Sequence, residues 1–76
     1  MGQYSTILSR LKINGSFYLC NFSTAYTVLD LLTYLGFNKN VVVIDYNGSI
    51  LEKVRWSKVQ LQHNDSLEIL SIAGGG

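Results

Sequence analysis

The 76-residue sequence has no proline, a single cysteine, a single histidine and few charged residues. The lone cysteine, Cys20, excludes an internal disulfide framework and is typical of a protein from a reducing compartment. Only 14% of the residues are charged and the net charge is +1. The chain therefore carries no basic stripe for nucleic acid and no acidic tail. No apolar run approaches the roughly 18 residues of a membrane span, and the first residues do not resemble a secretory signal.

Residue types that usually carry catalysis or bind metals are scarce or scattered. His63 has no cysteine, serine or carboxylate partner at a recognisable spacing, so we interpret it as a surface loop residue. The acidic side chains form no obvious pair and are interpreted as turn and rim residues: Asp45, Glu52, Asp65 and Glu68. No phosphate loop is present, because the glycines fall at turns and at the end of the chain. The sequence predicts no catalytic centre of its own, no metal site and no bound cofactor.

Apolar residues are plentiful, at 47% of the chain, and they supply enough core material for one small domain. We expect a single domain over residues 1–76, with 1–7 as a loose lead-in and 73–76 as a flexible C-terminal tail. The opening residues also match the short N-myristoylation pattern, with Gly2 as the acceptor. False matches to so short a pattern are frequent.

The first half of the chain predicts a hairpin followed by a helix. Residues 8–13 alternate in polarity like a half-buried strand, Asn14-Gly15 is a strong hairpin signal, and 17–22 is an aromatic return strand. Cys20 in that strand is interpreted as a packing or rim residue rather than a nucleophile. The apolar residues of the helix share one face: Val28, Leu31, Leu32 and Leu35. Thr27 is suited to cap its start and Gly36 its end.

The second half predicts another hairpin, a crossing segment and a last strand. Residues 41–46 and 50–51 flank Asn47-Gly48, and 52–59 crosses the end of the sheet with Trp56 as an anchor. Three basic residues surround this tryptophan, so nucleotide stacking is an alternative to a solvated loop. Residues 67–72 are apolar at nearly every position, which predicts a central strand, parallel to the first. The order predicts an α+β domain of the β-grasp, ubiquitin-like type: a mixed sheet of four to five strands packed on one main helix.

Several stretches carry a resemblance to a known family. They are Leu-Lys-Ile-Asn-Gly at 11–15, the helix 27–36, the strand and turn 43–50, Trp56, and 64–76 with its terminal Gly74, Gly75 and Gly76. In this order they resemble the ThiS family, the sulfur carriers of thiamin thiazole biosynthesis. The resemblance covers about residues 11–76. The lead-in of about ten residues is longer than is usual for that family.

The resemblance implies a carrier protein rather than an enzyme. An E1-like adenylyltransferase of the ThiF type would use ATP to convert the Gly76 carboxylate to an acyl-adenylate. A relay from a cysteine desulfurase would then give 1-thioglycine at Gly76, and thiazole synthase of the ThiG type would receive the sulfur. Gly74 and Gly75, which have no side chains, would thread the narrow channel of a partner.

Docking on those partners is assigned to Phe17 and Leu19 in the aromatic strand and to Ile72 at the end of the last strand. Interfaces of this kind are apolar at the centre with a polar rim. We expect a monomer when free, with no nucleic acid or membrane partner. The family resemblance places it in the bacterial cytoplasm or the plastid stroma.

Alternative functions remain open at this level. One is the MoaD-like small subunit of molybdopterin synthase, although the proline and aromatic residues that usually precede its terminal glycines are absent here. Another is a ubiquitin-like protein modifier, in which Gly76 would end in an isopeptide bond. A third is a non-catalytic interaction domain with an inert tail.

Overall fold

The structure is a computed structural model, and it describes residues 6–72. The elements follow in the order β1 (Thr6–Ile13), β2 (Ser16–Ser23), α1 (Val28–Leu35), β3 (Val42–Tyr46), β4 (Ser49–Leu51), the short 3₁₀ helix η1 (Lys53–Arg55) and β5 (Ser66–Ser71). The predicted tail 73–76, and with it Gly74, Gly75 and Gly76, lies outside the described residues, as does Gly2.

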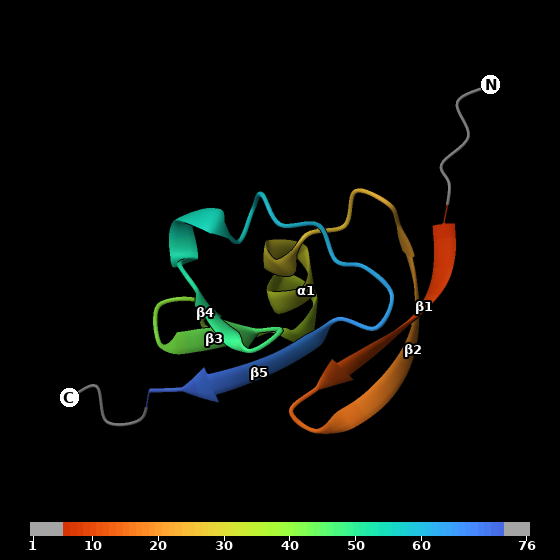
Figure 1. Ribbon diagram of the computed structural model, residues 1–76. Helices are drawn as coiled ribbons and strands as arrows, with labels where there is room; N and C mark the ends of the chain where they lie inside the picture. Colours follow the sequence, from red (N-terminus) through yellow and green to blue (C-terminus); the bar gives the residue numbers. More distant parts are fainter. Residues whose placement is uncertain (1–5, 73–76) are drawn as a thin grey trace.

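The strands form one five-stranded sheet in the order β2-β1-β5-β3-β4. β1 and β5 run parallel, and the other neighbouring pairs are antiparallel. α1 packs against one face of the sheet, and no element of residues 6–72 covers the other, which we call the open face (Figure 1). This is the β-grasp fold, so the predicted fold class is confirmed, and β5 is central and parallel to β1 as predicted.

Both hairpins have the turn that their Asn-Gly pairs predict. Asn14 and Gly15 have φ of 50° and 87°, and Asn47 and Gly48 have φ of 51° and 94°. Two successive left-handed residues match the right-handed twist of the strands that they join. The first hairpin is longer than predicted, because β1 begins at Thr6, within the expected lead-in of residues 1–7. Thr6 pairs with Ser23 at the far end of β2.

The helix begins and ends at the predicted residues. The Thr27 hydroxyl accepts a hydrogen bond from the Asp30 N–H at 3.1 Å, and the Asp30 carboxylate accepts from the Thr27 N–H at 2.9 Å. This capping box satisfies two N–H groups that a helix start otherwise leaves free. Gly36 ends the helix in the left-handed conformation at φ 81°. Leu35 was expected on the buried face but is exposed, because the helix ends there and Phe37 packs against the core instead.

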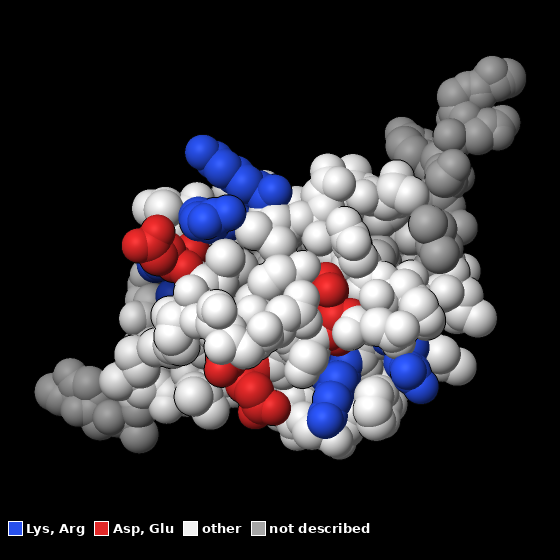
Figure 2. Space-filling view, viewed as in Figure 1, with Lys and Arg blue, Asp and Glu red and all other residues white. Residues whose placement is uncertain are grey.

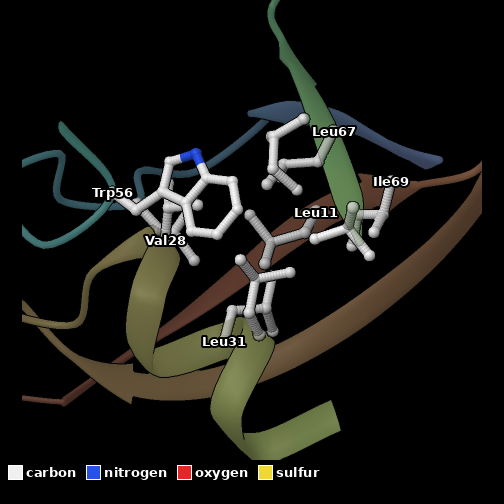
Figure 3. Packing of buried hydrophobic residues seen from close by; sticks show 10 residues of the cluster. Leu11, Val28, Leu31, Trp56, Leu67 and Ile69 are labelled. Atoms are coloured by element: carbon white, nitrogen blue, oxygen red, sulfur yellow. The ribbon is translucent and has the colours of Figure 1, made fainter. Parts of the chain in front are cut away.

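The core fills the space between α1 and the covered face of the sheet. In Figure 3 the side chains of Leu11, Val28, Leu31, Trp56, Leu67 and Ile69 converge on one another. Trp56 is buried, and its Nε1–H donates to the Leu51 carbonyl at 3.0 Å. The predicted role of Trp56 as an anchor is therefore confirmed. Its buried indole has no free face on which a nucleotide could stack, which contradicts the nucleotide alternative.

The last strand is central, but only alternate residues of its apolar run are buried. Leu67 and Ile69 are buried, whereas 54% of Leu70 and 52% of Ile72 are exposed. Glu68 is also exposed. Since successive side chains of a strand point to opposite faces, β5 alternates between the core and the open face. The apolar run therefore predicted the central position correctly, although only half of its residues are buried, because the described elements cover the sheet on one side only.

Asp65 was interpreted as a turn or rim residue, but it is buried. Its carboxylate accepts hydrogen bonds from the Tyr46 hydroxyl at 2.6 Å, the Asn47 Nδ2 at 3.1 Å and the Gln62 N–H at 2.8 Å. A buried carboxylate requires such partners, because an unpaired one has a large desolvation penalty. Asp65 thus ties the β3–β4 turn to the start of β5.

Candidate docking face

The open face is built from alternate residues of neighbouring strands, and the pairing register shows which of them share it. Lys12 pairs with Phe17 and Arg10 with Leu19 across β1 and β2. Val43 pairs with Leu70 and Asp45 with Glu68 across β3 and β5. Figure 2 shows that charged side chains are few and scattered on the visible side of the molecule, between large uncharged areas.

Phe17 and Leu19 form one apolar patch, the β2 patch. They are 61% and 72% exposed. The Arg10 guanidinium lies 4.9 Å from the centre of the Phe17 ring and the Lys12 Nζ lies 5.5 Å from it. Arg10 is held in place because its Nε and Nη2 donate to the Asn64 Oδ1 at 3.2 and 3.0 Å. The β2 patch therefore has a basic rim.

A second apolar patch lies where β5 ends, and we call it the tail-side patch. It consists of Val41, Val43, Leu70 and Ile72. The Ile72 N–H donates to the Val41 carbonyl at 2.6 Å, so the ladder between β3 and β5 continues one pair beyond Ser71. The described part of the chain ends beside this patch, at Ile72.

The structure separates the predicted docking residues. Phe17 lies opposite Lys12, which pairs with Ser66 at the start of β5. Ile72 lies six residues further along, about 20 Å at the usual rise of a strand. Phe17 and Leu19 are thus together, whereas Ile72 belongs to the other patch. Two acidic residues that are cross-strand neighbours, Asp45 on β3 and Glu68 on β5, lie between Ser66 and the tail-side patch.

Leu70 and Val43 were not among the predicted docking residues. A signal for Leu70 was available, since it and Ile72 have the same parity as the charged Glu68, whereas Leu67 and Ile69 have the opposite parity. Period-two alternation assigns the residues on the parity of a charged residue to the solvent face. The continuous apolar run obscured this alternation.

The cysteine and the histidine, the side chains best suited to covalent or metal chemistry, contact structural groups of the fold. Cys20 is partly buried against the core, and this burial raises the pKa of its thiol. His63 is exposed, and its Nδ1 accepts a hydrogen bond from the Arg10 N–H at 3.0 Å. Residues 6–72 contain no group of three or more metal-ligating side chains. In that same stretch, no helix is long and apolar enough to cross a membrane.

Comparison with known proteins gives a family match over nearly the whole chain. The sequence model of the ThiS family matches residues 11–76. The ycf40 protein of Trieres chinensis is 39% identical over 64 residues, which cover 84% of this chain and 85% of that protein. The sulfur carrier protein ThiS of Bacillus subtilis is 34% identical over 50 residues, 66% of this chain and 76% of that protein.

A larger protein and a solved structure also match. Thiazole synthase of Paramagnetospirillum magneticum is 37% identical over 67 residues, which cover 88% of this chain but only 20% of that protein. The crystal structure of the thiamine biosynthesis protein ThiS from Geobacter metallireducens superposes with a TM-score of 0.75 at 26% identity. The superposition covers 88% of this chain and 99% of that one.

Proposed function

This chain belongs to the ThiS family, and on that premise we propose that it is a sulfur carrier for the biosynthesis of the thiazole part of thiamin. The observation that carries the proposal is the family match, which extends through Gly74, Gly75 and Gly76. The relative from Bacillus subtilis that is named a sulfur carrier protein supports the same function. In this role the chain is a co-substrate on which partner enzymes act, and it is not itself an enzyme.

The chemistry takes place at the Gly76 carboxylate. A carboxylate is a poor electrophile, so an E1-like adenylyltransferase of the ThiF type first joins it to the α-phosphate of ATP, and pyrophosphate leaves. The outer sulfur of a persulfide supplied from a cysteine desulfurase then attacks the acyl carbon, AMP leaves, and an acyl disulfide forms. A thiol of the relay protein cleaves this S–S bond, releases the thiocarboxylate and leaves as a disulfide with the other sulfur. The product is a thiocarboxylate, 1-thioglycine at Gly76. The ATP belongs to the partner, and this chain binds no cofactor of its own.

We propose that the tail carries the reacting group, while the folded domain supplies the surface that binds the partner. Gly74 and Gly75 have no side chains, so a narrow channel can admit them, but ordering each backbone residue costs about 1–2 kcal/mol. The partner must compensate for that cost with contacts elsewhere. The tail-side patch of Val41, Val43, Leu70 and Ile72 supplies apolar surface at the end of the described chain. The β2 patch, with Phe17 and Leu19, offers a second contact.

The acceptor of the sulfur is proposed to be a thiazole synthase of the ThiG type. The similarity between this chain and a fifth of the Paramagnetospirillum magneticum thiazole synthase supports that pairing, because a carrier-like segment there belongs to the same polypeptide as the synthase. For the location we propose the plastid stroma, which the ycf40 name of several relatives supports. The bacterial relatives favour the bacterial cytoplasm as the alternative.

Intact mass spectrometry tests the proposal. The chain is incubated with ATP, a ThiF-type enzyme and a cysteine desulfurase with cysteine, and a variant that lacks Gly76 is the matched control. We expect a mass gain equal to the replacement of one oxygen by sulfur in the full chain and none in the control. A ladder of conjugates to other proteins would contradict the proposal in favour of a protein modifier. Assembly with a large subunit of molybdopterin synthase and sulfur transfer to its pterin substrate, but not to thiazole synthase, would favour the MoaD-like alternative.

A further inference from the structure

The two edges of the sheet differ in length and in protection. β4, at one edge, is only three residues long. β2, at the other edge, has eight residues, Ser16–Ser23, none of which is charged. Proteins usually protect an edge strand by shortness, by charges, by proline or by a bulge. β2 is long and has neither a charged residue nor a proline, and no other element of residues 6–72 pairs with its outer edge (Figure 1).

The hydrogen-bonding groups that β2 presents outward can be identified. A two-residue turn joins Ile13 to Ser16, and in such a hairpin this closing pair exchanges hydrogen bonds. Bonded and non-bonded pairs then alternate along an antiparallel ladder. In agreement, the Lys12 and Arg10 N–H groups point away from β2, to the Asp65 carbonyl and the His63 Nδ1. The N–H and C=O groups of Phe17, Leu19, Asn21 and Ser23 therefore face outward at the free edge.

A groove runs beside this edge, between β2 and α1. Its lining includes Cys20, Phe22, Tyr26, Leu31 and Tyr34, and none of its lining residues is charged. Tyr34 on α1 and Tyr18 on β2 are both large and exposed. A strand added to the β2 edge would place every second side chain on the helix side of the sheet, in this groove. The site thus suits an extended, uncharged segment with apolar side chains at alternate positions.

We propose that the segment that occupies this edge is β2 of a second copy of the chain, so that two sheets join into one around a twofold axis. β2 itself meets the requirements, since it is extended, uncharged and carries Tyr18, Cys20 and Phe22 on the helix side. Its lack of charge means that no like charges face one another when it pairs with itself. A twofold axis lets each copy fill the groove of the other with the same residues.

The outward groups also determine the register. Residues opposite each other in an antiparallel pair share a face, so Phe17 can lie opposite Ser23 of the other copy, and Leu19 opposite Asn21. This register gives a partner to every outward-facing residue of the strand. On the helix side it places Tyr18 opposite Phe22 of the other copy. The Cys20 residues of the two copies then form a non-bonded pair on the axis, about 4.5 Å apart at Cα.

This inference is independent of the proposed function. β1 separates β2 from β5, so pairing at the β2 edge leaves the end of β5 at Ser71 accessible. The sequence alone favoured a monomer, and the unprotected edge is the structural ground for replacing that expectation.

Sedimentation velocity over a wide concentration range tests the pairing, with Asn21→Pro as the decisive variant. The Asn21 N–H points to the free edge, so proline there removes a bond to the second copy and leaves the bonds to β1 in place. We expect a concentration-dependent species of twice the monomer mass for the wild type, and a dissociation constant about tenfold or more higher for Asn21→Pro. Leu19→Lys should weaken the dimer as well, while the matched Ile50→Lys on the β4 edge should not. Circular dichroism confirms that each variant folds.

A wild type that stays monomeric throughout would overturn the proposal and leave this edge to a strand of another protein. A dimer insensitive to both β2 variants would overturn the placement of the interface. Mild oxidation tests the register, because Cα atoms about 4.5 Å apart are within the range of a disulfide. We expect a reducible Cys20–Cys20 dimer that Cys20→Ser abolishes. A dimer that forms without this cross-link would contradict the register.

Discussion

The two sides of β5 carry the same kinds of apolar residue, but one side is buried and the other is exposed. Leu67 and Ile69 face α1 and are buried, whereas Leu70 and Ile72 face the open side and are about half exposed. Composition cannot account for this difference, because leucine and isoleucine occur on both sides. The helix covers only one face of the sheet, so the strand stabilises the domain with one set of side chains and is free to contact a partner with the other. Stability and recognition are thus assigned to alternate residues of one strand.

The largest expected effect comes from the tail, which belongs to neither side of the strand. Deleting Gly76 should withdraw the reactive carboxylate by about 3.5 Å of chain. Misplacing a reacting group by even 1 Å can cost about 100-fold in rate, so adenylation should be abolished. We expect no change in thermal unfolding, because the core lies within residues 11–69. Pyrophosphate exchange with a ThiF-type enzyme and a thermal melt measure the two properties.

If the deletion lowered thermal stability, the glycines would contribute to the fold, and the separation of a reactive tail from a stabilising strand would be wrong. If pyrophosphate exchange continued unchanged, the tail would not be the reactive arm. A chain extended by one residue beyond Gly76 is a matched control, since it moves the carboxylate by the same amount in the other direction and should be equally inactive.

The next effect compares the two sides directly. Ile69→Ala removes a side chain that is only 4% exposed and leaves a cavity, so it should lower the free energy of unfolding by about 2–5 kcal/mol. Leu70→Ala, one residue away on the open face, should change it by no more than about 0.5 kcal/mol. Urea denaturation of both variants measures the difference. Equal losses would mean that a partner or a second copy covers the open face.

A smaller effect should distinguish the two patches of the open face. Leu70→Ala removes apolar surface from the tail-side patch and should raise the KM for adenylation about tenfold, or 1.4 kcal/mol. Leu19→Ala in the β2 patch should raise it less, because that patch lies at the other end of the face. The kcat should stay unchanged in both variants, since neither side chain touches the carboxylate. A larger effect of Leu19→Ala would reverse the assignment of the two patches.

Local signals in the sequence were sufficient for most of the fold. The Asn-Gly pairs predict both hairpin turns, and Thr27 and Gly36 mark the ends of the helix that the structure contains. The parallel pairing of β1 and β5 was also predictable, although the argument from a continuous apolar run was only half right. Whether a helix covers one face of the sheet or both depends on tertiary packing, so it cannot be predicted from the local pattern of residues 67–72.

The docking residues and the buried carboxylate were harder to predict. Phe17, Leu19 and Ile72 are exposed as expected, but their separation depends on the register between β1 and β5, which the sequence does not contain. Asp65 occurs in an ordinary turn sequence, and its burial depends on Tyr46, which lies 19 residues away along the chain. Such long-range partners become visible only once the strands are aligned.

Asp65 and Tyr46 are a polar exception on the buried side, and they support the smallest prediction. Burial, then the hydrogen bond to Asp65 and its negative charge, raise the pKa of Tyr46 to about 12 from its ordinary value of 10. The folded state therefore holds the phenolic proton more tightly than the unfolded state does. The stability from this difference is complete below pH 10, and it is lost as the pH rises from about 10 to about 12.

Tyr46→Phe should lower the free energy of unfolding by about 1 kcal/mol at pH 7, because one hydrogen bond to Asp65 is lost while those from Asn47 and Gln62 remain. Between pH 10 and 12 the difference between wild type and variant should shrink, since ionisation of Tyr46 removes the same bond from the wild type. Urea denaturation of both proteins at a series of pH values measures this convergence, and the comparison cancels the titration of lysines common to both. A difference that stayed constant up to pH 12 would mean that Tyr46 stabilises the sheet by packing alone.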